Sequence, residues 1–292
     1  MNRAEIEAGY RRIQASFAAG LERVDGTSTF TREPWSRPGG GGGESWTLAG
    51  EGPLERAAVN FSAVWGEMPA TMTDRLAAET REFFATGIST IVHPRDPHAP
   101  TFHANLRYFE TDDTAWFGGG ADLTPYYLFP EDATHFHRVL AETSSRHPVT
   151  DYPGWKAECD RYFYLPHRGE ARGVGGIFFD HMTENQEGIW AFQRELGGAL
   201  EAAYLPILER RIGTSADDKQ RFWHEIRRGR YVEFNLVWDR GTRFGLDTGG
   251  RTESILASLP PRARWDESFR PEPGSPEAEL LALVRGEPRT WV

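Results

Sequence analysis

Polar and apolar side chains alternate strictly between residues 102 and 108. The odd positions carry an imidazole, an amide and a guanidinium, from His103, Asn105 and Arg107. The even positions are apolar: Phe102, Ala104, Leu106 and Tyr108. Because successive side chains of a strand point to opposite faces, this pattern predicts a β-strand over 102–109 with one polar side. The chain is therefore expected to build a sheet that presents these three polar groups together.

The regions around this strand predict helices and further strands. Residues 2–24 place apolar side chains at alternating spacings of three and four, which is typical of an amphipathic helix. Further helices are expected over 69–86, 130–147, 152–165, 184–204, 215–229 and 274–286, and further strands over 87–94, 114–117, 175–180 and 230–239. Ser215 and Ser275 are the expected N-caps of the last two helices. Residues 27–53 predict a loop, because Pro38 and the glycines at 39–43 cannot sustain a regular element.

The order of these elements indicates the fold class. Strands come in neighbouring groups with helices between the groups, which favours an α+β layered fold over strict βαβ alternation. The sequence has no internal repeat and no composition break that resembles a linker. A single domain over residues 1–292 is the simpler interpretation.

Charge and cysteine content limit the partners and the compartment. The 33 basic residues are outnumbered by 43 acidic ones, and the formal charge of −10 argues against nucleic acid or an anionic membrane as a general partner. The single cysteine, Cys159, excludes an internal disulfide and fits a reducing cytosol. The N-terminus has no apolar run of signal-peptide length, and no stretch approaches the roughly 18 apolar residues of a transmembrane helix. We therefore expect a cytoplasmic protein without an integral membrane segment.

The polar side of the strand over 102–109 is a candidate recognition surface. An arginine fork binds a carboxylate through two hydrogen bonds, and a histidine can move a proton near neutral pH. Glycines 118–120 permit a tight turn and the close approach of a ligand. Asp122, which follows them, could be a general base or could accept a hydrogen bond from an N–H group. The alternatives are an ordinary solvent-facing strand and a turn-forming aspartate.

Two other segments combine cations with glycines. Arg168 and Arg172 lie in the loop HRGEARGVGG, which would offer a positive and accessible backbone to an anion. Gly249, Gly250 and Arg251 lead into a short predicted helix whose first amides would also favour a negative group. The alternative for both is a charged loop in which the glycines serve only the turn.

The sequence lacks the common motifs of metal sites, catalytic nucleophiles and nucleotide binding. The chain has nine histidines but no HExxH, no GxSxG and no glycine-rich nucleotide fingerprint. A metal site would have to assemble from distant residues such as His93, His103, His137 and His167, and each of these singly is more often structural. The residues alone therefore predict an enzyme with a polyanion-binding pocket of several arginines and glycine-rich loops.

Six segments together resemble the oxygen-dependent coproporphyrinogen III oxidase family. They are WSRPGGGGG, VNFS at 59–62, STIVHPRDPHAPTFHANLRYF, WFGGGADLTPYY, CDRYFYLPHRGEARGVGGIFFD and GRYVEFNLVWDRGTRFGLDTGGRTESILASLPP. They cover nearly everything between residues 35 and 261. The chain departs from the family where Glu158 replaces a tryptophan before the cysteine, and where HPRDP and GGGADL replace HPRNP and GGGFDL.

The resemblance implies a fold and a reaction. The fold is a large, flat antiparallel β-sheet covered by α-helices on both faces, and the protein works as a homodimer. The reaction is the oxidative decarboxylation of two propionates of coproporphyrinogen III to vinyl groups, which gives protoporphyrinogen IX. Dioxygen is the co-substrate, carbon dioxide and hydrogen peroxide are released, and no organic cofactor is needed because the reduced tetrapyrrole is itself reactive.

The resemblance also assigns roles to single residues. Ser89, Asn105, Arg107, Gly249, Gly250 and Arg251 match substrate-contacting positions, and His103 matches the proton donor. Asp122 is expected to hold the pyrrole N–H groups and assist deprotonation, and Arg172 to clamp a propionate. His93, His103, His137 and His167 match positions sometimes given to a divalent metal, so the resemblance allows a divalent metal as a cofactor. The main alternative function is a non-catalytic tetrapyrrole carrier, and a second is a metal-dependent oxygenase acting on another polycarboxylate.

Overall fold

Seven antiparallel strands form the main sheet of the computed structural model, which describes residues 2–67, 82–247 and 250–292. In spatial order they are β1 (Thr31–Ser36), β2 (Gly41–Leu48), β3 (Leu54–Glu67), β4 (Glu82–Pro94), β5 (Thr101–Thr111), β6 (Ala115–Thr124) and β9 (Gly175–Met182). The short strands β7 (Tyr164–Leu165) and β8 (Glu170–Ala171) pair with each other in a second, small sheet. Strand β4 lies at the centre of the large sheet, with three strands on either side.

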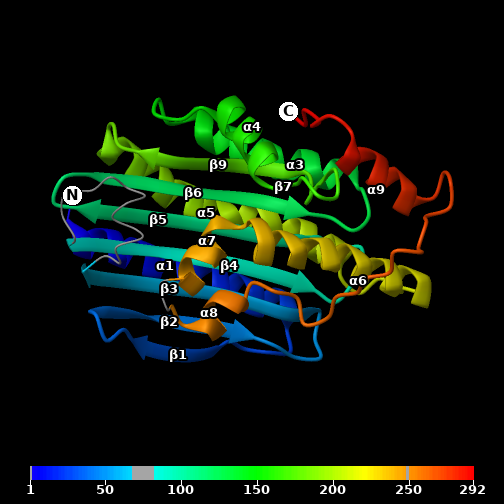
Figure 1. Ribbon diagram of the computed structural model, residues 1–292, viewed down its shortest axis with the longest axis horizontal. Coiled ribbons are helices and arrows are strands. Elements are labelled where there is room, and N and C mark those ends of the chain that lie inside the picture. Colours follow the sequence, from blue (N-terminus) through cyan, green and yellow to red (C-terminus); the bar gives the residue numbers. More distant parts are fainter. Residues whose placement is uncertain (1, 68–81, 248–249) are drawn as a thin grey trace.

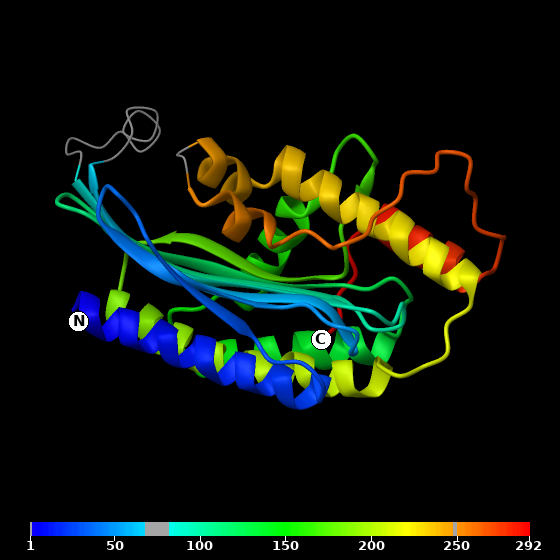
Figure 2. The ribbon, with the colours of Figure 1, turned by 90° about the horizontal axis from the view of Figure 1, so that it is seen from below.

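Helices cover both faces of this sheet (Figures 1 and 2). On the face that we call the back lie α1 (Arg3–Asp25), α3 (Pro130–Ser145) and α5 (Gln186–Arg211). On the other face, which we call the front, lie α6 (Asp218–Glu233), the π-helical segment η1 (Phe234–Trp238), α7 (Arg240–Asp247) and α8 (Thr252–Leu256). Helices α4 (Tyr152–Tyr162) and α9 (Pro276–Arg285) lie toward the β9 side of the sheet. The predicted α+β fold with helices on both faces is confirmed.

The apolar core lies between the back of the sheet and its helices. The even side chains of β5, including Phe102 and Leu106, are fully buried there with Phe17 of α1 and Tyr204 of α5. Burying an aromatic or leucine side chain is worth roughly 1.5 to 3 kcal/mol, so burial on this face stabilises the fold strongly. The front face is thereby free to carry polar groups. No helix in the described ranges is long and apolar enough to cross a membrane.

Most predicted helices are present close to their expected bounds. Strand β5 and helices α1, α3, α4, α5 and α9 correspond to the predictions, and Ser275 is the N-cap of α9, accepting from the N–H of Ala278. The N-cap of α6 is Asp217 rather than Ser215. Asp217 forms a capping box with Gln220, which satisfies two backbone donors reciprocally and so outcompetes the serine.

Three predictions of elements are wrong. The loop expected over 27–53 contains strands β1 and β2, because Gly40 and Gly41, with φ of 120° and 81°, supply only the turn between them. The strand expected over 230–239 is the end of α6 followed by η1, since Tyr231 and Phe234, three residues apart, are buried on one helical side. Of the helix expected over 69–86, residues 82–86 belong to β4, and the rest lies outside the described residues.

The glycine run 118–120 is a further correction. It lies within strand β6, opposite Arg107 and Asn105 of β5, and not in a tight turn. A Cβ on Gly120 would lie 2.5 Å from the carbonyl oxygen of Ile177, which explains why a side chain is excluded there. On the front face, the space that a side chain of Gly118 would take is occupied by Arg107 and Asp180.

Candidate active site

Small and polar residues form two neighbouring rows across the front of the sheet. Strand register aligns one row as Ser45, Asn60, Ser89, Asn105 and Gly120, and the next as Gly43, Ser62, Gly87, Arg107 and Gly118. A third row contains His103 and, opposite it on β6, Asp122. The predicted side chains at 89, 103, 105, 107 and 122 thus share one face on three adjacent strands, because the pairing register matches their alternation.

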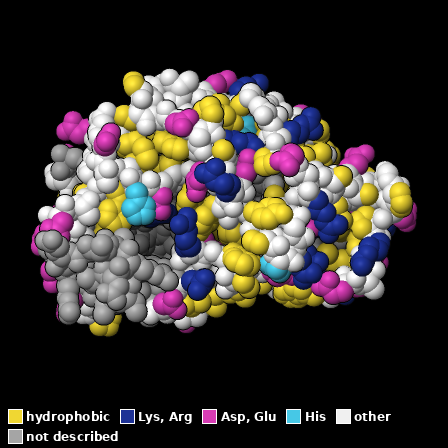
Figure 3. Space-filling view, turned by 45° about the horizontal axis from the view of Figure 1, so that its top comes forward, with side chains coloured by type: hydrophobic (Ala, Val, Ile, Leu, Met, Phe, Trp, Pro, Cys, Tyr) yellow, Lys and Arg dark blue, Asp and Glu magenta, His cyan; other side chains and the backbone are white. Residues whose placement is uncertain are grey.

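The side chain at the centre of this face is open to solvent. Ser89 is exposed although it lies on β4, the central strand of seven. A side chain in the middle of a sheet can be exposed only where the layer above it is open, so the described helices leave an opening over Ser89, which we call the hollow. The space-filling view shows Lys and Arg side chains in the middle of this side of the molecule, with Asp and Glu side chains beside them (Figure 3). A hollow floored by small residues and rimmed by cations suits a flat, polyanionic ligand.

His103 is oriented by a buried carboxylate. Its Nδ1 lies 2.8 Å from Oδ1 of Asp122, and the side chain is 23% exposed. No described residue makes a hydrogen bond to Nε2 of His103. Since the carboxylate fixes the ring and its Nδ1 proton, Nε2 is left as the nitrogen that can exchange a proton with a ligand.

Asp122 is held in turn by Arg172. The Nη2 atom of Arg172 lies 2.6 Å from Oδ2 of Asp122, and Nη1 donates to Oδ1 of Asn235 at 3.1 Å. Burial alone would raise the pKa of the Asp122 carboxyl, but the charge of Arg172 and the bond from His103 lower it below its ordinary value. Asp122 is therefore an anion that accepts hydrogen bonds, which suits the support of a histidine better than the removal of a proton.

Arg172 does not reach the hollow. Its side chain is 2% exposed, and its guanidinium carbon lies 4.0 Å from the ring centroid of Phe163, with the rings of Tyr231 and Phe234 also within 5 Å. The aromatic rings and Asp122 together hold the cation by cation–π and ionic contacts. The structure thus places Arg172 behind Asp122, and a direct bond to a substrate carboxylate would need this cluster to open.

Arg107 is held at the edge of the hollow by two oxygen atoms. Its Nη1 donates to Oδ1 of Asn105 at 2.8 Å, and its Nη2 lies 2.8 Å from Oδ1 of Asp180 on β9. The arginine side chain is 34% exposed and that of Asp180 is 23% exposed. The fork is therefore fixed in direction but still accessible to a ligand.

Arg251 lies on the same face at the other side of the sheet. It precedes α8, and its Nη2 donates to Oε2 of Glu33 on β1 at 2.5 Å. Helix α8 is fixed over β2 and β3 by Ser254, whose Oγ lies 2.6 Å from that of Ser45 and whose carbonyl accepts from Asn60. Gly250 ties this turn to α7 by donating to the carbonyl of Gly245, and Gly249 lies outside the described residues.

The structure does not place the four histidines predicted as possible metal ligands around a common point. His93 on β4 bonds through both ring nitrogens, to Thr101 and to the carbonyl of Ser258. His137 on α3 bonds to Tyr152 and to the carbonyl of Val174, and His167 bonds to Glu233 and Trp238. Among the described residues, no group of three or more His, Cys, Asp or Glu side chains could hold a metal ion. These residues therefore do not fit a shared metal centre.

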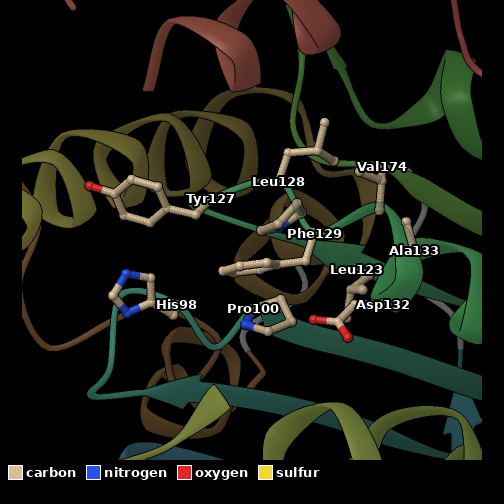
Figure 4. A pocket seen from close by; sticks show the side chains of 10 residues that line it. His98, Pro100, Leu123, Tyr127, Leu128, Phe129, Asp132, Ala133 and Val174 are labelled. Atoms are coloured by element: carbon tan, nitrogen blue, oxygen red, sulfur yellow. The ribbon is translucent and has the colours of Figure 1, made fainter. Parts of the chain in front are cut away.

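A separate small pocket lies near the start of β5 and the end of β6. Figure 4 shows His98 and Pro100 from the β4–β5 connection facing Phe129, with the carboxylate of Asp132 close by. Its volume is about 10 Å³, which is room for about one water molecule. It is too small for any tetrapyrrole and does not compete with the front face as the candidate site.

Three polar residues of the site were not predicted from the sequence. Asp180 and Glu33 each pair with a predicted arginine, and Asn60 bonds to the carbonyl of Ser254 beside the central strand. Asp180 follows Gly176 and Phe178 at period two and shares their face, so alternation alone could have placed it on one side of a strand. Only the pairing of β6 with β9 could have placed it beside Arg107.

Comparison with known proteins assigns the chain to a family. The profile of coproporphyrinogen III oxidase matches residues 5–291. The chain is also 47% identical over 308 aligned residues to a Glycine max protein named oxygen-dependent coproporphyrinogen-III oxidase, chloroplastic. That alignment covers 99% of this chain and 80% of the relative.

The chloroplastic relative corrects one expectation. The predicted cytoplasmic location is not supported, because the Glycine max protein is chloroplastic. The lone cysteine and the lack of an apolar N-terminal run led to that prediction, but they do not distinguish the cytosol from other reducing compartments.

The same matches confirm two other predictions from the sequence motifs. One is the resemblance itself, and the other is the enzyme class, an oxygen-dependent oxidoreductase acting on coproporphyrinogen III. The chain belongs to the coproporphyrinogen III oxidase family.

Proposed function

We propose that this oxidase binds coproporphyrinogen III over the front face of the sheet and there converts two of its propionates to vinyl groups. The macrocycle lies above Ser89, and propionates are held by Arg107 on one side and Arg251 on the other. The observation that carries the proposal is the exposure of Ser89 on the central strand, beside the row of His103 and between the two accessible arginines.

The reaction needs no electrons from the protein. Each propionate side chain, CH2CH2COOH, reacts with one dioxygen molecule to give a vinyl group, carbon dioxide and hydrogen peroxide. The side chain loses two electrons, two protons and carbon dioxide, and dioxygen takes up the two electrons and two protons to become hydrogen peroxide. The electron-rich porphyrinogen is the reductant, so the chain has to bind, orient and move protons.

His103 is the proton carrier in this proposal. Its Nδ1 is committed to Asp122, so Nε2 faces the substrate and passes a proton between it and the reduced oxygen. Asp122 and Arg172 act as the support of the histidine: the buried anion favours the imidazolium when it forms, and the arginine keeps Asp122 ionised. This role for Asp122 replaces the expected direct hold on the pyrrole N–H groups.

Cofactor use follows from the same chemistry. The proposal contains dioxygen as co-substrate and no organic cofactor. A divalent metal is not assigned a place in it, since the ring nitrogens of His93, His137 and His167 already have protein partners.

A homodimer is also part of the proposal. Large apolar side chains are exposed near the end of η1, and two of them, Trp238 and Trp265, donate to the neighbouring His167 and Glu233. Exposed apolar groups gathered in this way are typical of a surface that another protein covers. Light scattering on the purified chain tests this; a monomer at micromolar concentration would count against it.

Turnover under controlled oxygen tests the proposed function. The chain is incubated anaerobically with coproporphyrinogen III, air is admitted, and product is measured by protoporphyrin fluorescence after oxidation. We expect product only after air is admitted. His103→Ala should keep its affinity for the substrate but lose about 10²-fold or more in kcat, because it lacks the proton carrier.

The two alternative functions give different results in this assay. A carrier would bind coproporphyrinogen III without product in air, for the wild type as for His103→Ala. An oxygenase for another polycarboxylate would show neither binding nor turnover with this substrate. Either result overturns the proposal.

A further inference from the structure

Asp180 and Arg107 meet across a strand that lies between their own. Arg107 is on β5 and Asp180 on β9, and β6 separates these two strands. The pair passes over Gly118, where a Cβ would lie 2.6 Å from Oδ1 of Asp180 and 2.9 Å from Nε of Arg107. The ion pair therefore occupies the space of the side chain that Gly118 lacks, and no larger residue fits beneath it.

The carboxylate of Asp180 is held firmly in this position. Its Oδ1 also accepts from the backbone N–H of His181 at 2.9 Å, and His181 has a left-handed backbone with φ of 52°. The ring of His181 is stacked on Trp116, with centroids 5.0 Å apart and planes at 12°. A non-glycine residue in this conformation is uncommon, and here it aims its N–H at the carboxylate.

The bonds of Arg107 leave space for one further carboxylate. Within the described part of the chain, two of its five N–H groups have partners, which are Asn105 and Asp180. The remaining N–H groups suffice for one bidentate carboxylate, and a second would lie against the negative charge of Asp180. In coproporphyrinogen III every pyrrole carries one propionate and one methyl group, so only one carboxylate per ring needs to be accommodated.

We propose that Asp180 is a specificity-determining residue, which fixes the Arg107 fork and repels a pyrrole that carries a second carboxylate in place of its methyl group. This inference rests on the proposed function, in which Arg107 binds a propionate. The chemical class that Asp180 excludes is a porphyrinogen whose four methyl groups are carboxymethyl groups, with eight carboxylates in all. Bringing like charges together at a binding site costs enough binding free energy to make the eight-carboxylate porphyrinogen bind more weakly.

Inhibition by the eight-carboxylate porphyrinogen tests the inference. Its inhibition constant is measured against coproporphyrinogen III turnover for the wild type and for Asp180→Asn. We expect the ratio of this constant to KM for coproporphyrinogen III to fall by about 10-fold or more in the variant, because only the eight-carboxylate porphyrinogen is relieved of the repulsion. A ratio unchanged within about twofold, as when the constant moves in parallel with KM, overturns the proposal.

Further variants separate the effect of the Asp180 charge from any effect of the substitution on the fold. Asp180→Ser also removes the charge and can still accept from His181, so it serves if Asp180→Asn fails to fold. Asp180→Glu keeps the charge and should keep most of the discrimination. The matched control is Glu110→Gln, which removes a carboxylate from an arginine pair on the same strand as Arg107 but on the back face, and should leave the inhibition constant unchanged.

A double-mutant cycle with Arg107→Ala distinguishes a failure of this inference from a failure of the proposed function. If Asp180 acts where Arg107 binds, Asp180→Asn should have little effect on the inhibition constant in the Arg107→Ala background. A full effect there overturns the inference. If Arg107→Ala alone leaves KM for coproporphyrinogen III unchanged, the proposed function loses its propionate site, whatever Asp180 does.

Discussion

Asp122 and Arg172 form a buried ion pair, with 2.6 Å between Oδ2 and Nη2 and side chains that are 3% and 2% exposed. The same carboxylate bonds to Nδ1 of His103 through its other oxygen. One anion thus connects the buried guanidinium of Arg172 to the imidazole of His103 on the front face.

Replacing Asp122 by Asn should reduce both catalysis and stability. We expect kcat to fall by about 10²-fold, because an amide neither fixes the tautomer of His103 nor stabilises its imidazolium. Unfolding should cost about 3 kcal/mol less, because Arg172 keeps a buried charge without its partner. Steady-state kinetics and urea denaturation measure the two effects.

A second substitution separates these two roles of Asp122. Replacing Arg172 by Met in the Asp122→Asn background removes the unpaired charge, so part of the stability should return while kcat stays low. If stability and kcat recovered together, Asp122 would influence turnover only by stabilising the folded protein.

Glu33→Gln should improve substrate binding. Glu33 is 53% exposed and pairs with Arg251, which is 29% exposed, so a propionate has to displace or share this carboxylate. An exposed pair is worth up to about 1 kcal/mol, and we therefore expect KM to fall by up to about fivefold with kcat unchanged. Arg251→Ala is the opposing control: losing a charge-assisted bond of roughly 1.5 to 3 kcal/mol should raise KM by about 10-fold or more. A higher KM in Glu33→Gln would instead mean that Glu33 holds the Arg251 side chain in its binding position.

Stability should decline below about pH 6.5 because of His224. Burial, with Arg228 close by, holds the pKa of His224 well below its ordinary value of 6.5, and its Nε2 has no hydrogen-bond partner among the described residues. The unfolded chain therefore takes up the proton first as the pH falls. This contribution to the unfolding free energy is complete above about pH 6.5 and is lost below it, by up to about 1.4 kcal/mol per pH unit.

His224→Phe isolates this contribution. The phenyl ring retains the contact with Tyr126, whose ring centroid lies 4.1 Å from that of His224, but it does not titrate. We expect urea denaturation to show a smaller loss of stability between about pH 7.5 and pH 5 in the variant than in the wild type. Equal losses in both proteins would assign the pH dependence to other groups.

Exhaustive chelation should leave turnover unchanged. Both ring nitrogens of His93 and His137 are used in protein hydrogen bonds, so neither can bind a metal without breaking contacts of the fold. Activity is measured after dialysis against a chelator and again after single divalent metals are added back. Activity lost on chelation and restored by one metal would require a site that these histidines do not form.

The sequence predicts the polar strand well because its signal is local. Alternation over 102–108 depends only on the pleat of one strand, and β5 is found where it was expected. The same is true of α1 and of α9, where Ser275 precedes a proline at the first turn. These elements follow from residues that are neighbours in the chain.

Register and tertiary contact account for what the sequence could not predict. Residues 230–239 have the composition of a strand, yet packing of Tyr231 and Phe234 in the helical layer decides their structure. The burial of Arg172 and the pairing of Asp180 with Arg107 depend on which strands become neighbours, and that information is absent from either segment alone.

The glycines at 118 and 120 limit how this enzyme can adapt. They have no side-chain rotamers, and the space of a side chain is already taken by Arg107 and Asp180 at Gly118 and by Ile177 at Gly120, so neither position can offer a new side chain to a ligand. Any adjustment to a puckered or differently substituted ring must come from the helical layer above it. Evolution of new ring preferences should therefore alter α6 to α8 and their connections, while the central strands keep their contour.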